Sequence, residues 1–236
     1  MSEASASYGQ FCPVARATEI LAGRWTPLVL RELLGGCRRF NDFRRGLPQM
    51  SPTLLSRRLR ELEEAQVLER RAGKSSPRVA AIEYWPTPAA EELRPLLECL
   101  GTWGQRWAAA RIRSDDCEPD TLMWLTRRYL RVPALPRQPC VLLYQFSGVP
   151  ARRRNWWIVV EKGAADLCLK DPRRELDVLI AAPVEPLVRI YLGQVEPAAA
   201  VRAGRVRVSG ASEFVRSFPR WCARSRFAGV KPARAA

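Results

Sequence analysis

The sequence predicts an α+β chain with two folded domains, the first mainly helical and the second a sheet covered by helices. Its 236 residues exceed one average domain and suffice for two small ones. With 47% hydrophobic and 27% charged residues, the chain has enough apolar side chains for two cores. Helical spacing dominates the first half, whereas the second half places strand-like runs before helical ones, as in an α+β sheet.

The first domain, predicted over residues 11–111 after a disordered stretch at 1–10, opens with helices that carry start and stop signals. Thr26 is expected to cap a helix whose first position is Pro27, and a glycine pair at 35 and 36 ends it. Further helices are expected from Val14 to Leu21, through Phe40, Phe43 and Leu47, and from Pro52 onward.

The helix that opens at Pro52, after a Ser51 cap, has two different faces. Leu55, Leu59 and Leu62 fall at i, i+4 and i+7, which defines a core-facing stripe. The opposite face carries the polar residues Thr53, Ser56, Arg57 and Arg60. Two short helices joined by a tight turn, the second exposing polar and arginine side chains, match helix-turn-helix geometry. The alternative is an ordinary amphipathic helix with a solvated basic face.

The residues after this helix predict a β-hairpin. Val67–Arg71 and Val79–Trp85 have strand composition, and the intervening AGKSSPR has turn composition. A hairpin directly after a recognition helix is a wing, whose tip is expected to contact phosphates or the minor groove through Lys74 and Arg78. Together these elements predict a winged helix-turn-helix domain.

A long helix is predicted to close this domain after a Thr87 cap and Pro88. It carries an apolar stripe at helical spacing, namely Leu93, Leu96, Leu97, Leu100, Trp103 and Trp107. The stripe either covers the core of its own domain or forms a dimer interface.

Charge and composition limit the function classes. The net charge of +15 favours a nucleic-acid partner, although an arginine-rich composition can lack any function. The chain has no histidine, which excludes Ser-His-Asp, Cys-His and HExxH sites. The charged residues Asp166, Lys170, Asp171 and Asp177 lie close in sequence, but they flank a predicted turn and are interpreted as solvated strand ends. We therefore predict no enzyme activity, no cofactor and no catalytic residue.

The cysteines and the N-terminus indicate where the protein works. Seven scattered cysteines without a CxxC pair argue against a disulfide framework and a structural zinc site, so we expect no metal. No run of eighteen apolar residues occurs, and MSEASASYGQ lacks a basic start and an apolar core. We expect no membrane partner and a cytoplasmic protein.

Residues 10 to 110 resemble the HxlR-type family of bacterial winged helix-turn-helix transcriptional regulators. The motifs that carry the resemblance are CP, GRW, RFNDFR, PQMSPTLLSRRLREL and EYWPTP, in that order. The resemblance implies a homodimer that binds double-stranded DNA at a pseudo-palindromic operator, usually as a repressor. Residues implied to contact base edges are Thr53, Ser56, Arg57 and Arg60. Those implied to contact phosphates are Arg38, Arg39, Arg44, Arg45, Ser51, Lys74 and Arg78. Those implied to form the dimer interface are Leu93, Leu97, Leu100, Trp103 and Trp107.

Cys12 precedes Pro13 at a predicted helix start, where the helix dipole favours the thiolate. Some relatives of the HxlR type use the cysteine of this motif to sense oxidants or electrophiles. The resemblance therefore makes Cys12 a candidate redox switch, and a cysteine that only packs or contacts the dimer partner is the alternative.

The second domain is predicted over residues 140–226, after a linker at 112–139 that holds a short helix from Thr121 to Leu130, and before a disordered end at 227–236. Strands are expected at Val141–Phe146, Trp156–Val160, Ala165–Leu169, Leu176–Ile180 and Val206–Val208. Helices are expected at Pro183–Leu192, Pro197–Ala203 and Ser212–Cys222. This order predicts a mostly antiparallel sheet covered by helices.

Residues 140 to 223 resemble the sterol carrier protein (type two) fold, through the DLCLKDP strand end, the YLG helix end and the closing helix. That fold implies a cavity for an apolar molecule, lined here by Trp156, Trp157, Leu167, Leu169, Leu187, Ile190, Tyr191 and Phe214. Each of these residues can equally fill a core. The combined hypothesis is a regulator modulated by an apolar small molecule. The rival is a lipid-binding module without sequence-specific DNA binding.

Overall fold

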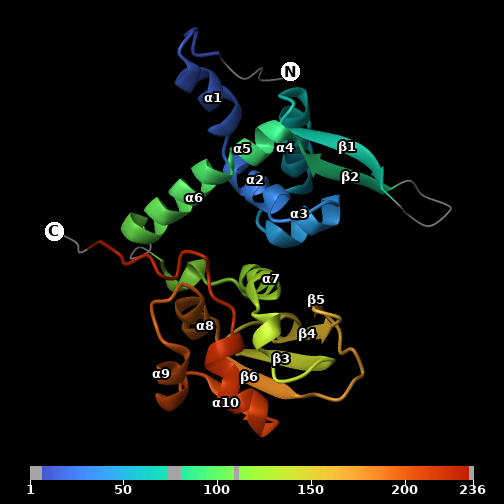
Figure 1. Cartoon of the computed structure of the whole chain (residues 1–236), viewed down its shortest axis with the longest axis vertical. Coiled ribbons are helices and arrows are strands. Elements are labelled where there is room, and N and C mark those ends of the chain that lie inside the picture. Colours follow the sequence, from blue (N-terminus) through green and yellow to red (C-terminus); the bar gives the residue numbers. More distant parts are fainter. Residues whose placement is uncertain (1–6, 74–80, 109–111, 234–236) are drawn as a thin grey trace. The chain divides into compact units, whose positions relative to one another are not determined.

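A computed structural model describes residues 7–73, 81–108 and 112–233 (Figure 1). The chain divides into two compact units, an N-terminal unit of residues 1–100 and a C-terminal unit of residues 101–236. Each unit is described by itself below.

The N-terminal unit consists of helices and one antiparallel hairpin. Its helices are α1 (Pro13–Leu21), α2 (Thr26–Leu34), α3 (Phe40–Gly46), α4 (Pro52–Glu64), α5 (Pro88–Glu92) and α6 (Arg94–Trp103), the last of which crosses the unit boundary. The hairpin pairs β1 (Leu68–Gly73) with β2 (Ala81–Pro86), with Leu68 opposite Pro86 and Gly73 opposite Ala81. The order of elements confirms the predicted winged helix-turn-helix arrangement.

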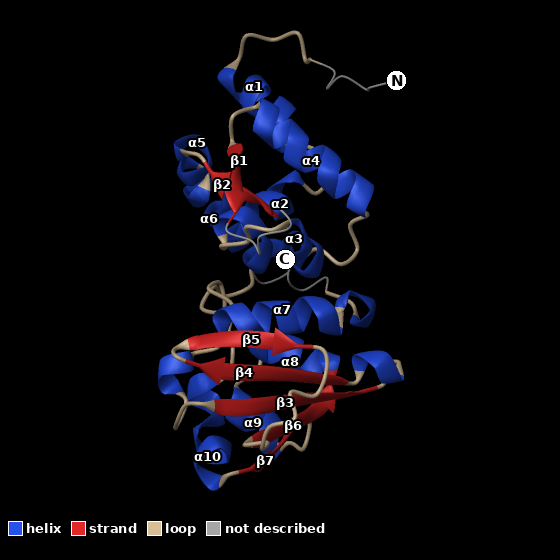
Figure 2. Cartoon of the chain, turned by 90° about the vertical axis from the view of Figure 1, so that its right-hand side faces the viewer, coloured by secondary structure: helices blue, strands red, loops and turns tan. Residues whose placement is uncertain are grey.

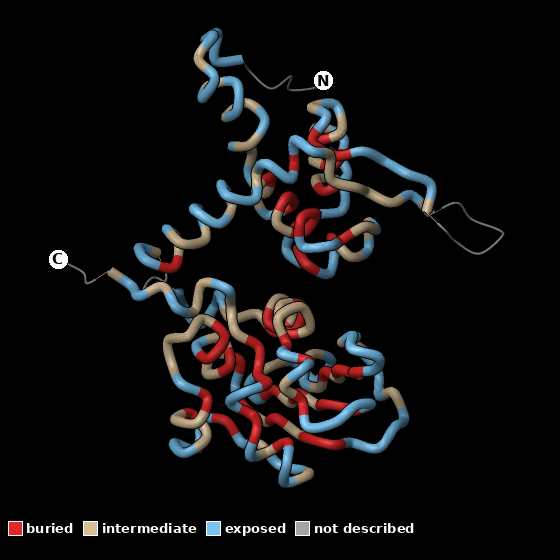
Figure 3. Tube along the Cα trace, in the orientation of Figure 1, coloured by how far each residue is buried: buried red, intermediate tan, exposed pale blue. Residues whose placement is uncertain are grey.

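The core of the N-terminal unit forms where α2, α3 and α4 pack together beside the hairpin (Figure 3). Its most buried apolar residues include Val29, Leu33, Phe43, Leu55 and Leu62. Phe43 meets Tyr84 of β2 edge to face, with ring centroids 5.9 Å apart, which is a favourable aromatic geometry. This packing holds the hairpin beside the helices.

Two helix boundaries differ from the prediction. Trp25, not Thr26, precedes α2; its φ is +79° and Thr26 is buried inside the first turn. The predicted long terminal helix is broken into α5 and α6. Pro95 lacks a backbone N–H and so cannot donate to the carbonyl four residues earlier, which gives the break at Leu93 a local cause.

The C-terminal unit contains a five-stranded sheet in the order β5-β4-β3-β6-β7 (Figure 2). Its strands are β3 (Cys140–Ser147), β4 (Asn155–Glu161), β5 (Ala164–Cys168), β6 (Val178–Pro183) and β7 (Arg207–Gly210). Its α-helices are α7 (Pro119–Tyr129), α8 (Val184–Tyr191), α9 (Pro197–Arg202) and α10 (Ser212–Trp221). Its short helical turns are η1 (Gly104–Ala108), η3 (Ser114–Asp116), η4 (Val132–Ala134) and η5 (Ala151–Arg153). Only the β3–β6 pair is parallel, which confirms the mostly antiparallel sheet.

One face of this sheet is buried against helices. Alternate residues of β3 and β4, such as Leu142, Tyr144 and Ile158, join apolar side chains of α8 and α10 in one core. The alternation along β4, and along β3 from Leu142 onward, is what a half-buried strand requires. The helices therefore cover this face, as the order of strands and helices predicts.

Two segments outside the predicted second domain belong to the C-terminal unit, and one of them takes part in this core. The predicted linker at 112–139 contains α7, whose Leu122 and Met123 are buried in it. The predicted disordered end at 227–236 is described as far as 233, where the Ala233 N–H donates to the Arg106 carbonyl at 2.8 Å. Apolar side chains in α7 explain the first difference, because their burial stabilises the sheet.

Candidate nucleic-acid interface

Helix α4 is fixed to the N-terminal unit by its leucines. Leu55, Leu59 and Leu62 are 0%, 2% and 1% exposed. The Leu54 N–H donates to the Ser51 side-chain oxygen at 3.2 Å, so the predicted cap is present. Because burial of a leucine side chain contributes about 1.5–3 kcal/mol, these three anchors hold the orientation of the whole helix.

The opposite face of α4 is solvent-exposed, as the helical spacing predicts. Thr53, Ser56, Arg57 and Arg60 are all exposed. Arg57 already has an ion-pair partner in the free protein, because its Nε donates to Glu61 Oε1 at 2.8 Å. The structure thus brings together, on one helix face, all four residues implied to contact base edges.

Glu61 joins two arginines of α4. It also accepts from Arg58, whose Nε donates to the Arg24 carbonyl at 3.3 Å. Burial disfavours the charged form of Glu61, but the hydrogen bonds and charges of Arg57 and Arg58 outweigh it and lower its pKa. Glu61 therefore remains an anion that positions Arg57. The i, i+4 spacing of Arg57 and Glu61 is the sequence signal that indicates this pair.

Three of the basic residues implied to contact phosphates have exposed side chains. Arg44 and Arg45 lie exposed in the last turn of α3, and neither has a side-chain partner within the described ranges. Arg39 is also exposed and lies 3.5 Å from Glu83 of β2. Arg44 and Arg45 are therefore available to an incoming phosphate, whereas Arg39 would have to exchange its contact with Glu83.

Arg38 departs from the implied role. Its Nη1 donates to the carbonyls of Leu33 and Cys37, at 2.8 and 2.9 Å. Its guanidinium also stacks on the Trp85 ring, 4.6 Å from the centroid. These contacts tie the end of α2 to the hairpin, so we interpret Arg38 as a structural residue.

Trp85 lies between two arginines and is the residue that the sequence analysis missed. Arg71 of β1 stacks on it at 4.9 Å, in addition to Arg38. The Tyr84 N–H donates to the Arg38 carbonyl at 2.7 Å and attaches β2 to the same loop. This arrangement sets the direction of the wing. The implied wing-tip contacts Lys74 and Arg78 lie outside the described residues.

Helices α1 and α6 expose apolar side chains instead of burying them (Figure 3). In α1, Val14 is 72% exposed, and the preceding Phe11 is 98% exposed. In α6, Leu100 and Trp103 are 47% and 62% exposed, and Trp107 beyond it is 55% exposed. Leu93 and Leu97, the other implied interface residues, are half-buried. Exposed apolar patches of this kind mark interaction surfaces.

Comparison with known proteins assigns this unit to a family. Residues 20–112 match the family model for HxlR-like helix-turn-helix proteins. The HTH-type transcriptional regulator YvaP of Bacillus subtilis is 35% identical over 99 residues, which are 42% of this chain and 90% of YvaP. YdeP of the same organism is 33% identical over 96 residues, which are 41% of this chain and 73% of YdeP. The chain belongs to the HxlR-like helix-turn-helix family.

A solved structure also matches the HxlR-like region. The reduced form of the transcriptional regulator YodB from B. subtilis is 27% identical, covers 41% of this chain and 93% of YodB, and gives a TM-score of 0.36. The family assignment rests on the sequence matches.

The HxlR-like domain is joined to a second family domain. Residues 141–221 match the SCP-2 sterol transfer family model, as the sequence resemblance indicates. Five of the residues implied to line an apolar cavity are buried core residues: Trp156, Leu187, Ile190, Tyr191 and Phe214. Leu167 packs against this core, Trp157 is half-buried, and Leu169 is 64% exposed. The structure thus places most of this set in core packing.

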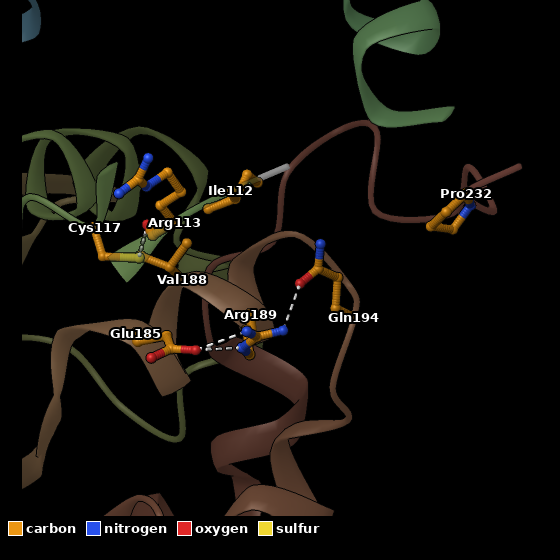
Figure 4. A pocket seen from close by; sticks show the side chains of 8 residues that line it. All are labelled: Ile112, Arg113, Cys117, Glu185, Val188, Arg189, Gln194 and Pro232. Carbon is orange, nitrogen blue, oxygen red and sulfur yellow. Dashed lines mark hydrogen bonds and ion pairs between the residues drawn. The ribbon is translucent and has the colours of Figure 1, made fainter. Parts of the chain in front are cut away.

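Hollows in the C-terminal unit are lined by residues outside the set implied to form the apolar cavity. One hollow of about 260 Å³ lies beside α8, and two of its lining residues, Arg189 and Glu185, form an ion pair of 2.7 Å (Figure 4). The rest of its lining comprises Ile112, Arg113, Cys117, Val188, Gln194 and Pro232. Glu185 and Arg189 neutralise each other, and the third charged lining residue, Arg113, lies 3.8 Å from Asp115, so this hollow offers no concentrated charge.

Cys12 stands at the start of α1, as predicted. The backbone N–H groups of Ala15 and Val14, at the start of the helix, favour the thiolate and lower the pKa of the thiol. Its side chain is partly exposed. The position therefore has the local chemistry of a reactive thiol.

Among the residues that the structure describes, we find no helix long and apolar enough to span a bilayer.

Proposed function

We propose that this DNA-binding transcriptional regulator of the HxlR family binds a pseudo-palindromic operator as a homodimer and acts as a repressor. The observation that carries the proposal is the leucine-anchored α4, whose Thr53, Ser56, Arg57 and Arg60 face solvent. A helix fixed in this way can present base-contacting side chains to the major groove without a further folding step. The repressor role rests on the family resemblance.

The arginines have two different tasks in this proposal. Arg57 and Arg60 contact base edges, where a bidentate arginine–guanine contact contributes roughly 1–3 kcal/mol of discrimination. Arg39, Arg44 and Arg45 contact phosphates, which adds salt-dependent affinity without sequence preference. Arg38 is left out of the phosphate set because carbonyl groups and Trp85 already hold its guanidinium.

A second copy of the chain is the proposed cover for the exposed apolar side chains of α1 and α6. Phe11, Val14, Leu100 and Trp103 are too exposed to stabilise their own unit by burial. A two-fold dimer would bury them and would place the two α4 helices about 34 Å apart, one turn of DNA. A pseudo-palindromic operator follows from that symmetry.

The proposal is tested by selecting bound duplexes from a random pool and repeating the selection at several salt concentrations. We expect a consensus of two inverted half-sites, with affinity that falls as salt rises. Sedimentation of Trp103→Asp should show a shift to monomer, whereas Arg220→Ala, an exposed change on α10, should leave the dimer intact. Recovery of random sequences, or of a single half-site bound by a monomer, would overturn the proposal.

A redox response through Cys12 is a second candidate, favoured by the lowered pKa of its thiol. In this scheme two Cys12 thiols of a dimer form one disulfide, and an oxidant such as diamide takes up the two electrons and the two thiol protons. Operator affinity should change after diamide treatment of the wild type and of Cys99→Ser, another exposed cysteine. It should stay constant in Cys12→Ser. A response that persists in Cys12→Ser excludes this candidate.

A further inference from the structure

Another hollow in the C-terminal unit lies where the parallel strands β3 and β6 end. It has a volume of about 520 Å³. Its lining residues are Gln145, Phe146, Ser147, Gly148, Arg154, Ala181, Ala182, Pro183, Gly204, Arg205 and Arg207. None of the residues implied to line the apolar cavity belongs to this set.

Three arginines reach this hollow from three different connections. Arg154 precedes β4, and its carbonyl accepts from the Phe146 N–H at 2.7 Å, which places it beside the end of β3. Arg207 begins β7 and pairs with Ala181 of β6. Arg205 follows Gly204, whose φ of +69° ends α9, and its N–H donates to the Ala200 carbonyl at 3.0 Å. Backbone pairing thus fixes where all three side chains start.

The charge around this hollow is not compensated within the described part of the chain. No aspartate or glutamate lines it, and no described side chain pairs with Arg154, Arg205 or Arg207. Elsewhere in the same unit, arginines have acidic partners, as in Arg153–Glu118 at 2.7 Å and Arg189–Glu185 at 2.7 Å. Three like charges around one hollow repel each other and attract an anion.

The remaining lining residues indicate the kind of anion. Ala181, Ala182 and Pro183 offer a small uncharged surface, and Ser147 and Gln145 offer hydrogen-bonding groups. Guanidinium groups bind phosphate oxygens in pairs of parallel hydrogen bonds.

We propose that this hollow binds a small molecule that carries a phosphate group. Arg154, Arg205 and Arg207 hold the phosphate, and the uncharged part of the molecule lies on Ala181 and Pro183. A small molecule fits a concave site better than the backbone of a DNA duplex, which needs an open surface along its grooves. The proposal does not depend on operator binding.

Calorimetry of the full chain with octyl phosphate, inorganic phosphate and uncharged octyl glucoside tests the site. We expect octyl phosphate to bind, inorganic phosphate to bind more weakly, and octyl glucoside not to bind. The triple change Arg154→Ser, Arg205→Ser and Arg207→Ser should raise the octyl phosphate Kd at least about tenfold, the effect of losing charge-assisted hydrogen bonds. The matched change Arg216→Ser and Arg220→Ser, two exposed arginines of α10, should leave the Kd unchanged.

Several results would overturn the proposal. One is the absence of octyl phosphate binding, and another is an equal loss in the triple variant and the matched α10 variant. Equal affinity for inorganic and octyl phosphate would show that the uncharged surface takes no part. A random duplex that binds the wild type but not the triple variant would make the surface a DNA contact. Thermal melting checks the fold of the triple variant, and Arg207→Ser alone should show a smaller loss in the same direction.

Discussion

Arg57→Ala is expected to weaken binding to the operator far more than binding to a random duplex. In the free protein, Arg57 Nε lies 2.8 Å from Glu61 Oε1, and the two side chains are 48% and 37% exposed. An exposed i, i+4 ion pair of this kind contributes about 0.3–0.5 kcal/mol. Release of the Arg57 guanidinium toward a base therefore costs little.

The expected loss follows from comparing this cost with the gain on DNA. A bidentate contact with guanine contributes roughly 1–3 kcal/mol. After subtraction of the Glu61 pair, Arg57→Ala should cost the operator complex about 0.5–2.5 kcal/mol, a factor of roughly two to seventy in Kd. On random DNA the guanine contact is absent, so the loss should be much smaller.

Fluorescence anisotropy with operator and scrambled duplexes, each at several salt concentrations, measures both losses. Arg44→Ala serves as the phosphate-type comparison. It should weaken both duplexes alike and reduce the salt slope by about one. Arg220→Ala, on the C-terminal unit, serves as the control. Equal losses for Arg57→Ala on the two duplexes would refute the assignment of Arg57 to base contact.

Three further predictions concern stability. Ser51→Ala removes the oxygen that accepts from the Leu54 N–H and should lower the free energy of unfolding in urea by about 0.5–2 kcal/mol. An unchanged urea midpoint would show that the cap does not stabilise the protein. Because the folded-state pKa of Glu61 is lowered, its contribution is present above the unfolded pKa of about 4.3 and is lost as pH falls through the folded value. The Tm difference between wild type and Glu61→Gln should therefore shrink in acid, and a constant difference would contradict this. Gly210 has a φ of +133°, and in Gly210→Ala the new Cβ would lie 2.3 Å from the Asp177 carbonyl oxygen. We therefore expect the free energy of unfolding to fall by roughly 1–3 kcal/mol or more. Wild-type stability of this variant would refute the prediction.

The sequence predicts α4 well because local chemistry alone determines it. Its leucine spacing, its Ser51 cap and its exposed polar face all follow from helical geometry, and the structure has each of them. The strand order of the second domain cannot be predicted from local chemistry. Pairing of β3 with β6 joins segments more than thirty residues apart, and no periodicity within either segment specifies that contact.

Two differences between the sequence-based expectations and the structure have the same origin. Arg38 looks like any exposed arginine in sequence, and only the tertiary contacts with Leu33, Cys37 and Trp85 remove it from the phosphate set. The segment before β3 resembles a linker because prolines flank it, yet α7 within it is buried on one face. Proline marks where helices and strands end, but it does not indicate whether the intervening helix packs on a core.

Trp85 provides the sharpest test of how the wing is held. Its ring lies between Arg38 and Arg71, and its Nε1 donates to Glu83 Oε2 at 3.3 Å. Each exposed cation–π contact contributes about 0.5–1 kcal/mol, so Trp85→Ala should lose roughly 1–2 kcal/mol from the two stacks, besides the buried area of the ring. Trp85→Phe keeps a ring for both guanidinium groups and should retain most of that stability. If the stack directs the wing, Trp85→Ala should also weaken operator and random DNA alike, whereas Trp85→Phe should not. Urea unfolding and anisotropy of the two variants decide this, because equal behaviour of Ala and Phe at this position would mean that the aromatic ring does not hold the wing.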